Sequence, residues 1–251
     1  MSPVPPRPRP IEAAMVLAAG RGTRMRPLTE RMPKALVRVA GHTLVDRALD
    51  RVAAAGIARA VVNIHHFAPM LAAHLAGRAG PPAIALSDET EALLETGGGV
   101  RRALPLLGPA PFLVLNADAV FAGPDPLGPL LAAWDPARMD ALMLLVPRSA
   151  TRGYTRPGDF LLSAEGAVPE RRGARETAPL VYSGAQVLAP GALDGTPEGA
   201  FSLNPVWDRL IDAGRLAAVT YPGLWADVGT PAGIAEAEAA LAEAEAGGPP
   251  V

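Results

Sequence analysis

Short apolar runs alternate with segments in which apolar residues recur every three or four positions, and this alternation covers most of the chain. Short aliphatic runs between turn-forming residues are typical of buried strands. The runs at 112–116 and 141–146 are almost continuously apolar, which indicates strands covered on both faces, as in a mainly parallel sheet. Strands are predicted at Ala14–Ala18, Ala60–Ile64, Ile84–Leu86, Phe112–Asn116, Ala141–Val146 and Leu180–Leu188.

Helical periodicity fills the intervals between these runs. Asn204-Pro205 and Thr230-Pro231 each place a capping residue before a proline, the arrangement that opens a helix. Helices are predicted at Thr43–Ala55, Phe67–Leu75, Val100–Leu107, Leu127–Trp134, 204–214 and Ala232–Ala246. The order of elements predicts an α/β fold: a doubly wound, Rossmann-like, mainly parallel mixed sheet with helices on both faces. Ligands of such sheets bind at the carboxyl ends of the strands.

The segment 147–180 interrupts this pattern, because it is rich in Gly, Arg and Pro. Its weak strand candidates, Phe160–Ser163 and Ala167–Pro169, suggest a small β-rich insertion that lines a pocket. The proline-rich residues 1–10 are predicted to form a flexible tail. Residues 11–251 are predicted to form one domain, which suits a chain of 251 residues.

Composition narrows the functional classes. A net charge of −2 argues against general nucleic-acid binding, which needs a basic face. The chain has no cysteine, which excludes disulfides, thiolate zinc sites and cysteine nucleophiles. No apolar run approaches the ~20 residues of a membrane span, and the N-terminal residues lack the apolar core of a signal peptide. We therefore expect a cytoplasmic protein; the sequence does not specify its oligomeric state.

The stretch Leu17–Lys34 (LAAGRGTRMRPLTERMPK) carries the strongest chemical signal. A predicted strand runs directly into two glycines, which let the backbone approach a phosphate, and five cations follow. Lys34 is the only lysine among 23 cationic residues. Either this position needs a compact ammonium group rather than a guanidinium, or one lysine has remained by chance in an arginine-rich chain. The loop is not a Walker A motif. Met25 replaces the third glycine of a dinucleotide fingerprint, which disfavours an NAD-dependent oxidoreductase.

This stretch closely resembles the opening of the sugar-1-phosphate nucleotidylyltransferases. The resemblance implies that the glycine loop binds the triphosphate of an NTP, that Arg24 contacts its β/γ-phosphates and that Lys34 contacts the phosphates at the reacting end. A later stretch, Glu95–Gly99 (ETGGG), resembles the family's loop against the nucleobase; taken alone, it is equally a helix N-terminus built from glycines. The residues assigned to NTP binding are Leu17, Ala18, Ala19, Gly20, Arg21, Gly22, Thr23, Arg24, Glu95, Thr96 and Gly97.

Two aspartates match the metal-binding motifs of the same family. Asp118 lies just after the predicted strand 112–116, in Asn116-Ala117-Asp118, where the family usually has Gly-Asp, so Ala117 is a departure. Asp227 lies in WADVGT, which resembles the family's W-x-D-x-G-T motif, and Thr230 is available to cap the next helix in its place. The resemblance implies that both aspartates bind Mg²⁺, a hard cation that prefers oxygen ligands. A solvated aspartate at a strand end is the alternative for Asp118.

The sugar end is less clearly marked. Tyr182-Ser183-Gly184 resembles a strand-borne element near the sugar, and alternatively is a strand with a glycine bulge. Asp159 in GDF either positions a sugar hydroxyl or lies in a plain turn. His65 and His66 point in different directions, which favours structural roles over a shared metal site. The residues assigned to sugar binding are Asn116, Asp159, Ser183 and Gly184.

The implied reaction joins an NTP to a sugar 1-phosphate and releases pyrophosphate by in-line attack, with Mg²⁺, Arg24, Lys34 and Asp118 as the catalytic groups. The overall motif set looks most like uridylyltransferases acting on N-acetylmuramate 1-phosphate in peptidoglycan recycling, so UTP is the expected nucleotide. Guanylyltransferases for mannose or heptose 1-phosphate share much of the pattern. A non-catalytic nucleotide-sugar sensor is the alternative of another class.

Overall fold

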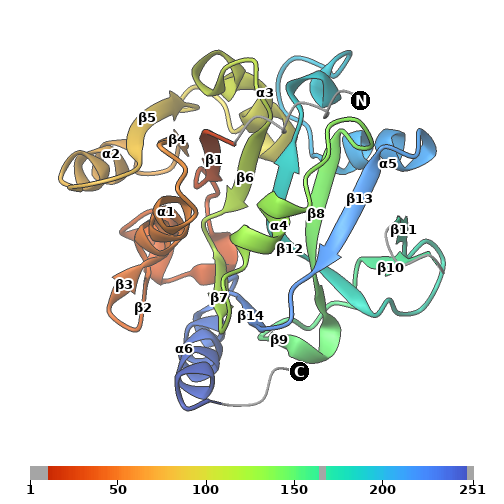
Figure 1. The fold of residues 1–251 in the computed structure, drawn as a ribbon. Coiled ribbons are helices and arrows are strands. Elements are labelled where there is room, and N and C mark those ends of the chain that lie inside the picture. Colours follow the sequence, from red (N-terminus) through yellow and green to blue (C-terminus); the bar gives the residue numbers. More distant parts are fainter. Residues whose placement is uncertain (1–10, 164–167, 248–251) are drawn as a thin grey trace, which may run out of the picture.

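The structure is a computed structural model that describes residues 11–163 and 168–247. Its centre is a nine-stranded sheet in which β11-β10-β12-β6-β1-β4-β5 are neighbours in that order, while β8 pairs with β12 and β13 pairs with β8 (Figure 1). The strands are β1 (Ala13–Leu17), β4 (Arg59–Ile64), β5 (Ala83–Asp88), β6 (Phe112–Asn116), β8 (Ala141–Pro147), β10 (Phe160–Leu162), β11 (Pro169–Arg171), β12 (Leu180–Leu188) and β13 (Leu216–Thr220). The proposed tail at 1–10 lies outside the described residues.

The sheet is mixed. β5, β4, β1 and β6 are mutually parallel, as the sequence predicts for a doubly wound α/β fold. β12 then runs antiparallel to both β6 and β8, and the hairpin β10–β11 extends the sheet beyond it. The predicted α/β class is confirmed, and all six predicted strands of the alternating pattern are present.

Two smaller sheets lie beside the main one. β7 (Ala119–Ala122), β14 (Leu224–Asp227) and β9 (Thr151–Arg152) form one, and β2 (Arg38–Val39) with β3 (His42–Thr43) the other. β13, β7 and β14 have no counterpart among the predicted strands. Each of these strands is short, and each is either rich in alanine or close to a glycine, so its local β propensity is weak. These strands form because they pair with strands that are distant in the sequence.

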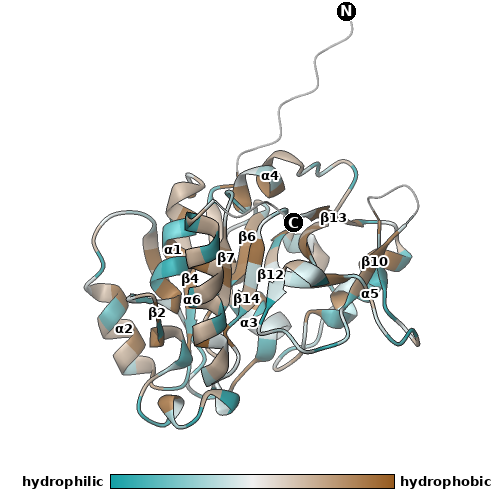
Figure 2. Cartoon of the chain, turned by 90° about the horizontal axis from the view of Figure 1, so that it is seen from below, coloured by the Kyte–Doolittle hydropathy of each residue, from teal (hydrophilic) through white to brown (hydrophobic). Residues whose placement is uncertain are grey.

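The helices are α1 (Leu44–Ala54), α2 (Ala68–Ala76), α3 (Glu95–Leu107), α4 (Leu127–Ala132), α5 (Asn204–Asp212) and α6 (Pro231–Glu245). Alternate residues of β1 join different buried clusters: Ala14 and Val16 pack with α1 and α2, while Ala13 and Met15 pack with α3 and α5. Helices therefore cover both faces, and Figure 2 shows the apolar residues concentrated on the central strands. None of the helices within 11–163 and 168–247 has the length and apolarity to cross a membrane.

The two predicted proline caps have different outcomes. Thr230 accepts a hydrogen bond from the backbone N–H of Gly233 at 3.3 Å, so it caps α6 as expected. Asn204 is not a cap, because Leu203 occupies the N-cap position of α5 and no side chain caps it. Instead, the side-chain oxygen of Asn204 accepts a hydrogen bond from Arg171 at 3.2 Å. Asn204 thus ties α5 to the hairpin β10–β11.

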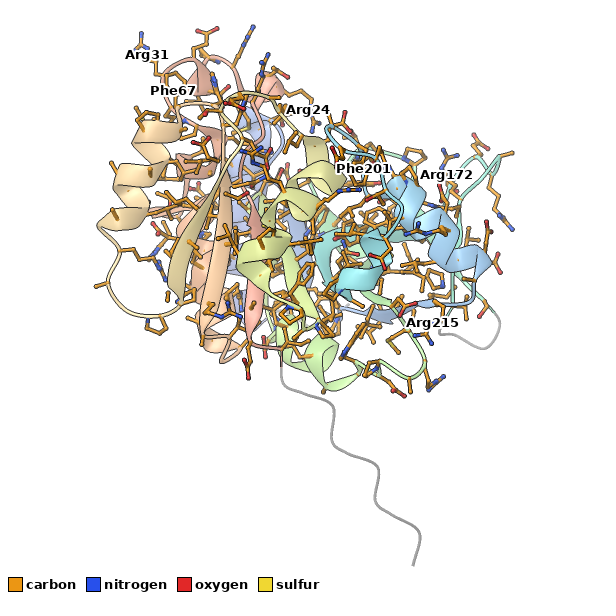
Figure 3. The ribbon with its side chains drawn as sticks, turned by 90° about the horizontal axis from the view of Figure 1, so that it is seen from above. Arg24, Arg31, Phe67, Arg172, Phe201 and Arg215 are labelled. Carbon is orange, nitrogen blue, oxygen red and sulfur yellow. The ribbon has the colours of Figure 1, made fainter. Side chains whose placement is uncertain are left out.

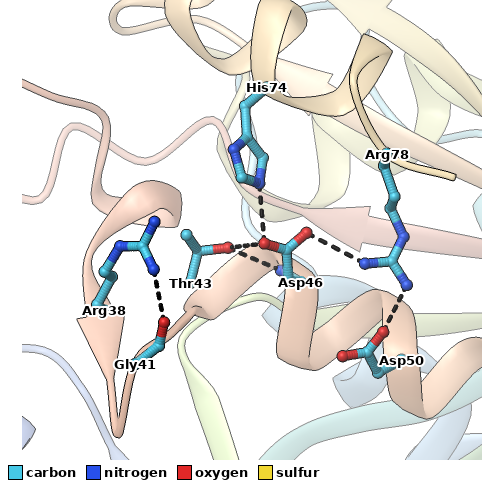
Figure 4. A network of polar contacts seen from close by, with 7 residues as sticks. All are labelled: Arg38, Gly41, Thr43, Asp46, Asp50, His74 and Arg78. Carbon is cyan, nitrogen blue, oxygen red and sulfur yellow. Dashed lines mark hydrogen bonds and ion pairs between the residues drawn. The ribbon is translucent and has the colours of Figure 1, made fainter.

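A polar network joins α1 to α2 (Figure 4). The carboxylate of Asp46 accepts hydrogen bonds from the hydroxyl of Thr43 at 2.6 Å and from Nη1 of Arg78 at 3.1 Å, and Nε2 of His74 lies 2.9 Å from it. Nη2 of Arg78 also pairs with Asp50 at 2.5 Å. Asp46 is therefore the shared acceptor of three side chains from two helices and their flanks.

We expect Asp46→Asn to lower the free energy of unfolding at pH 7 by about 1–2 kcal/mol, because charge-assisted hydrogen bonds are lost. Burial raises the pKa of Asp46, but the hydrogen bonds from Thr43, His74 and Arg78 outweigh it and hold this pKa below its ordinary value. Its stabilisation is thus present above the unfolded pKa of about 3.9 and is lost as pH falls through the folded pKa.

Urea unfolding from pH 7 to pH 3 measures this. The difference between wild type and Asp46→Asn should shrink as the pH falls. Asp50→Asn is the control, because Asp50 is 55% exposed and has one partner in this network. An equal loss in both variants would contradict the assignment.

Candidate functional site

A cavity of about 580 Å³ opens at the carboxyl ends of β1 and β6. A second cavity of about 200 Å³ shares Leu17, Gly20, Arg24 and Asp118 with it. This second cavity extends under the loop of residues 18–24 that follows β1, which we call the glycine loop. Figure 3 labels Arg24, which comes from this loop and lines both cavities, and Phe201, which comes from the segment before α5. The predicted location at the carboxyl ends of parallel strands is thus where the cavities lie.

The glycine loop is held by side chains rather than by regular structure. Gly22 has a φ of +60°, and a Cβ there would come within 2.9 Å of both the Lys34 Cβ and the Thr29 Cγ2. The hydroxyl of Thr29 donates to the Gly22 carbonyl at 2.8 Å, and the fully buried Met25 anchors the turn that follows. Around Gly20, by contrast, a Cβ would meet nothing within 4 Å. Gly22 therefore folds the loop, while Gly20 faces the open cavity.

The first two residues of the loop are already hydrogen-bonded. The backbone N–H groups of Ala18 and Ala19 donate to the side-chain oxygen of Asn63, at 2.6 and 3.2 Å. These two N–H groups are thus committed to the protein, so a phosphate cradle from residues 17–24 would use the later part of the loop. Arg21 is exposed and lines neither cavity.

The two predicted metal ligands come together on neighbouring strands. β7 and β14 are antiparallel, which sets Asp227 opposite Ala119, and the Val228 N–H donates to the Asp118 carbonyl at 3.2 Å. The Nζ of Lys34 donates to the Asp118 carboxylate at 2.5 Å. The side chains of Lys34, Asp118 and Asp227 are 13%, 33% and 17% exposed. Residues 34, 118 and 227, far apart in sequence, thus form one cluster.

Two carboxylates and three cationic side chains share this cluster. Burial raises the pKa of Asp227, and the neighbouring charge of Asp118 raises it further, against the opposing charges of Lys34, Arg156 and Arg24. The described residues contain no group of three or more His, Cys, Asp or Glu side chains placed to bind a metal. Two carboxylates nevertheless suit Mg²⁺, which commonly takes one or two from the protein and completes its shell with substrate phosphates and water. The residues present therefore fit the ion.

The larger cavity contains the residues assigned to the sugar. Gly184, with a φ of +86°, lets Asn116 approach so closely that a Cβ there would lie 2.9 Å from the Asn116 Cβ. Asp159 accepts hydrogen bonds from the Tyr182 N–H at 3.0 Å and the Tyr154 hydroxyl at 3.3 Å. The hydroxyl of the fully buried Ser183 donates to the Leu144 carbonyl at 2.7 Å. Asp159 and Ser183 thus hold the cavity wall together.

Two arginines of the cavity were not identified from the sequence. The Arg156 guanidinium lies 4.9 Å from the centre of the Tyr154 ring and 4.0 Å from the Asp227 carboxylate. Arg171 lies over the Phe160 and Trp207 rings and donates to Asp208 at 2.6 Å. Both come from the segment 147–180, where arginines are frequent and no motif distinguishes these two.

The ETGGG stretch forms the first turn of α3, which is the helix N-terminus that the sequence left open as the alternative, and its assignment to NTP binding stays a prediction. The N–H groups of Gly97 and Gly98 donate to the Phe201 carbonyl at 2.8 and 3.1 Å. A Cβ on Gly97 would lie 2.3 Å from the Phe201 ring. The absence of a side chain on Gly97 therefore allows the segment that contains Phe201 to pack against α3. Gly97 lines neither cavity, whereas Glu95 and Thr96 line the larger one.

The adjacent histidines contact separate segments. Nδ1 of His65 lies 2.6 Å from the Glu89 carbonyl oxygen, and Nε2 of His66 lies 3.1 Å from the Thr29 carbonyl oxygen. Both contacts are structural, in agreement with the interpretation favoured from the sequence.

Comparisons with known proteins agree with this geometry. Residues 14–196 match the family described as the MobA-like NTP transferase domain. The chain is 48% identical over 237 residues to the N-acetylmuramate alpha-1-phosphate uridylyltransferase of Caulobacter vibrioides, covering 92% of this chain and 97% of the relative. The protein of that name from Neisseria meningitidis serogroup B is 37% identical over 229 residues, covering 90% and 96%. The inositol-1-phosphate CTP transferase from T. maritima shares the fold, with a TM-score of 0.75 at 18% identity over 93% and 97% of the two chains.

Proposed function

The chain belongs to the family of MobA-like NTP transferase domains and is a nucleotidyltransferase; from this premise we propose that it condenses UTP with N-acetylmuramate 1-phosphate to give UDP-N-acetylmuramate and pyrophosphate. The observation that carries the choice of substrates is the 48% identity to a uridylyltransferase of that specificity over nearly the whole of both chains. In this proposal the protein acts in peptidoglycan recycling.

The two joined cavities support a division of labour between the substrates. The smaller cavity presents Gly20, Gly22, Arg24 and Lys34, which suit a triphosphate. The larger cavity adds aromatic and polar side chains, including Trp207, Tyr182 and Asn116, which suit a sugar ring and a base. Asp118 borders both cavities, so the bond that is exchanged would lie beside it.

The chemistry follows from this placement. An oxygen of the sugar phosphate attacks the α-phosphorus, the bond from that phosphorus to the bridging oxygen breaks, and pyrophosphate leaves with the bonding electrons. The attacking oxygen is already ionised near neutral pH, so no general base is required. Arg24 and Lys34 stabilise the leaving pyrophosphate. Asp118 and Asp227 would hold Mg²⁺, which supplies charge neutralisation to the reacting phosphates when bound.

Arg156 provides a cation on the side of Asp227 that faces the larger cavity, where the sugar phosphate would enter. We expect Arg156→Ala to raise KM for the sugar 1-phosphate about tenfold while KM for the NTP stays within about twofold, because one charge-assisted hydrogen bond is lost. Steady-state kinetics with each substrate varied in turn would measure this. A larger effect on the NTP would contradict the assignment.

A pyrophosphate-release assay tests the proposed function. UTP, GTP, CTP and dTTP would each be combined with N-acetylmuramate, N-acetylglucosamine, mannose and glucose 1-phosphates in the presence of Mg²⁺. The highest kcat/KM is expected for UTP with N-acetylmuramate 1-phosphate. Efficient turnover confined to GTP and mannose 1-phosphate would overturn the proposal in favour of a guanylyltransferase. Nucleotide binding without pyrophosphate release under any condition would indicate a sensor.

A further inference from the structure

A chain of buried polar groups runs beneath the glycine loop. Asn63 near the end of β4 is 2% exposed, and Glu89 just after β5 is 1% exposed. The side-chain oxygen of Asn63 accepts from the N–H groups of Ala18 and Ala19, as described above, and its amide nitrogen donates to Oε1 of Glu89 at 2.7 Å. Every polar atom of the Asn63 side chain is thus used, and the loop is joined to Glu89.

The other end of this chain reaches α3. Oε2 of Glu89 accepts from the N–H of Leu94, the N-cap residue of α3, at 3.2 Å. A Cβ on Gly99 would lie 2.8 Å from Oε1, so the helix is in direct contact with the carboxylate. Glu95 and Thr96 follow Leu94 and line the larger cavity. Asn63 and Glu89 together therefore connect the loop to the first turn of α3, and residues of both segments line the larger cavity.

We propose that Asn63 and Glu89 form a positioning pair that fixes the spacing between the glycine loop and the first turn of α3, and thereby shapes the NTP end of the cavity before the substrate binds. Asn63 lines the larger cavity, but its side-chain oxygen and nitrogen are both hydrogen-bonded within the protein, so the role of the pair requires no contact with substrate. Burying a carboxylate is costly unless its oxygens receive hydrogen bonds, and both oxygens here accept one from a fixed donor. The hydrogen bonds of the Glu89 carboxylate therefore serve to order the NTP end in advance. A loop that is already ordered loses less conformational entropy when the substrate binds. The inference rests on the proposed binding of NTP at this end.

The directions of these hydrogen bonds give a sharp test. In Glu89→Gln, the single amide oxygen can accept from only one of the two donors, and the amide N–H₂ then faces the other donor. In Asn63→Asp, a second carboxylate oxygen faces Oε1 of Glu89 across 2.7 Å. In the double variant Asn63→Asp/Glu89→Gln, Asp accepts from Ala18, Ala19 and the new amide, while the Gln oxygen accepts from Leu94. The double variant keeps every hydrogen bond and one buried carboxylate. The carboxylate is now at position 63, and the hydrogen bond between the two side chains runs from residue 89 to residue 63.

We expect each single variant to raise KM for UTP about tenfold or more, with KM for the sugar 1-phosphate within about twofold, and the double variant to return within about threefold of wild type. UTP binding by calorimetry without the sugar phosphate should show the same order, which gives a readout independent of turnover. The control for lost stability is Asp46→Asn, which weakens the contact between α1 and α2 and should leave KM for UTP unchanged.

Two outcomes would overturn the inference. One is a loss of melting temperature in the single variants with unchanged affinity for UTP. The other is a double variant whose defect equals the product of the two single defects, about 100-fold, because independent sites multiply in this way. If a single variant does not fold, the double variant decides alone, since it must fold and bind UTP as wild type does. A wild-type protein that binds no UTP would refute the proposed function instead, so the two failures are distinguishable.

Discussion

Asp118→Asn and Asp227→Asn should each lower kcat by about 10²–10³-fold, with the secondary structure unchanged. Each substitution keeps the shape of the side chain and removes one of the two negative charges available to a divalent cation in this cluster. Among the described residues, no third His, Cys, Asp or Glu side chain joins these two in a group that could bind a metal, so neither loss is compensated by another carboxylate. Steady-state turnover at several Mg²⁺ concentrations would measure the effect, which should be partly offset by a higher concentration of the ion.

The two variants should differ in stability. When folding raises the pKa of a carboxyl group, that group ionises more readily in the unfolded chain than in the folded protein. Above the pKa of the unfolded chain, the group therefore lowers the free energy of unfolding. Burial and the charge of Asp118 raise the pKa of Asp227, so Asp227→Asn should increase the melting temperature at pH 7. Asp118→Asn removes the ion pair with Lys34, which opposes any such gain. A loss of function with a gain of stability is the expected signature of a site kept for catalysis.

Asp212→Asn is the matched control, since Asp212 is an exposed carboxylate at the end of α5 and lines neither cavity. It should retain wild-type turnover and wild-type response to Mg²⁺. Near-normal kcat in both Asp118→Asn and Asp227→Asn would refute the two-aspartate assignment and with it the proposed role of the ion.

The sequence was sufficient for the parts of this protein that depend on local pattern. Long apolar runs predicted β1, β6, β8 and β12, because a buried strand needs apolar residues on both faces whatever its partners are. The family resemblance assigned Lys34, Asp118 and Asp227 to one site, and the structure brings the three residues together. Their positions in the fold are different: Asp118 follows β6 of the main sheet, Asp227 ends β14 of a smaller sheet, and Lys34 begins a short turn. The strands thus follow from a local rule, whereas the cluster follows from the motifs.

The remainder depends on contacts between distant segments. ETGGG has the composition of a loop, yet it forms the first turn of α3 because the Phe201 carbonyl satisfies its N–H groups and the glycines leave room for the Phe201 ring. Asn204 has the sequence signature of a cap, yet Arg171 takes its side chain into a contact with the hairpin. Asn63 and Glu89 belong to no motif, because their importance arises only when three segments meet around them.

Replacing Lys34 tests the residue that the composition singled out. Lys34→Met keeps an unbranched side chain of similar length and removes the charge, and we expect kcat/KM for the NTP to fall about 10²–10³-fold because a cation for the departing pyrophosphate is lost. The charge of Lys34 also opposes the raised pKa of Asp227, so this variant should shift the acidic limb of the pH–activity profile to higher pH. Rate measurements from pH 5 to pH 9 with each substrate varied would report both effects.

Lys34→Arg should recover little of this loss, although it restores the charge. Lys34 is 13% exposed, its Nζ lies 2.5 Å from the Asp118 carboxylate, and its Cβ packs closely under Gly22. A guanidinium is planar and larger, so it cannot replace a compact ammonium there without moving the glycine loop. Arg31→Met is the matched control: Arg31 is an exposed cation from the same stretch that lines neither cavity, and its loss should change kcat/KM by less than about threefold. Full activity in Lys34→Arg would mean that this site needs only a positive charge, and that the chain's one lysine is an accident of composition.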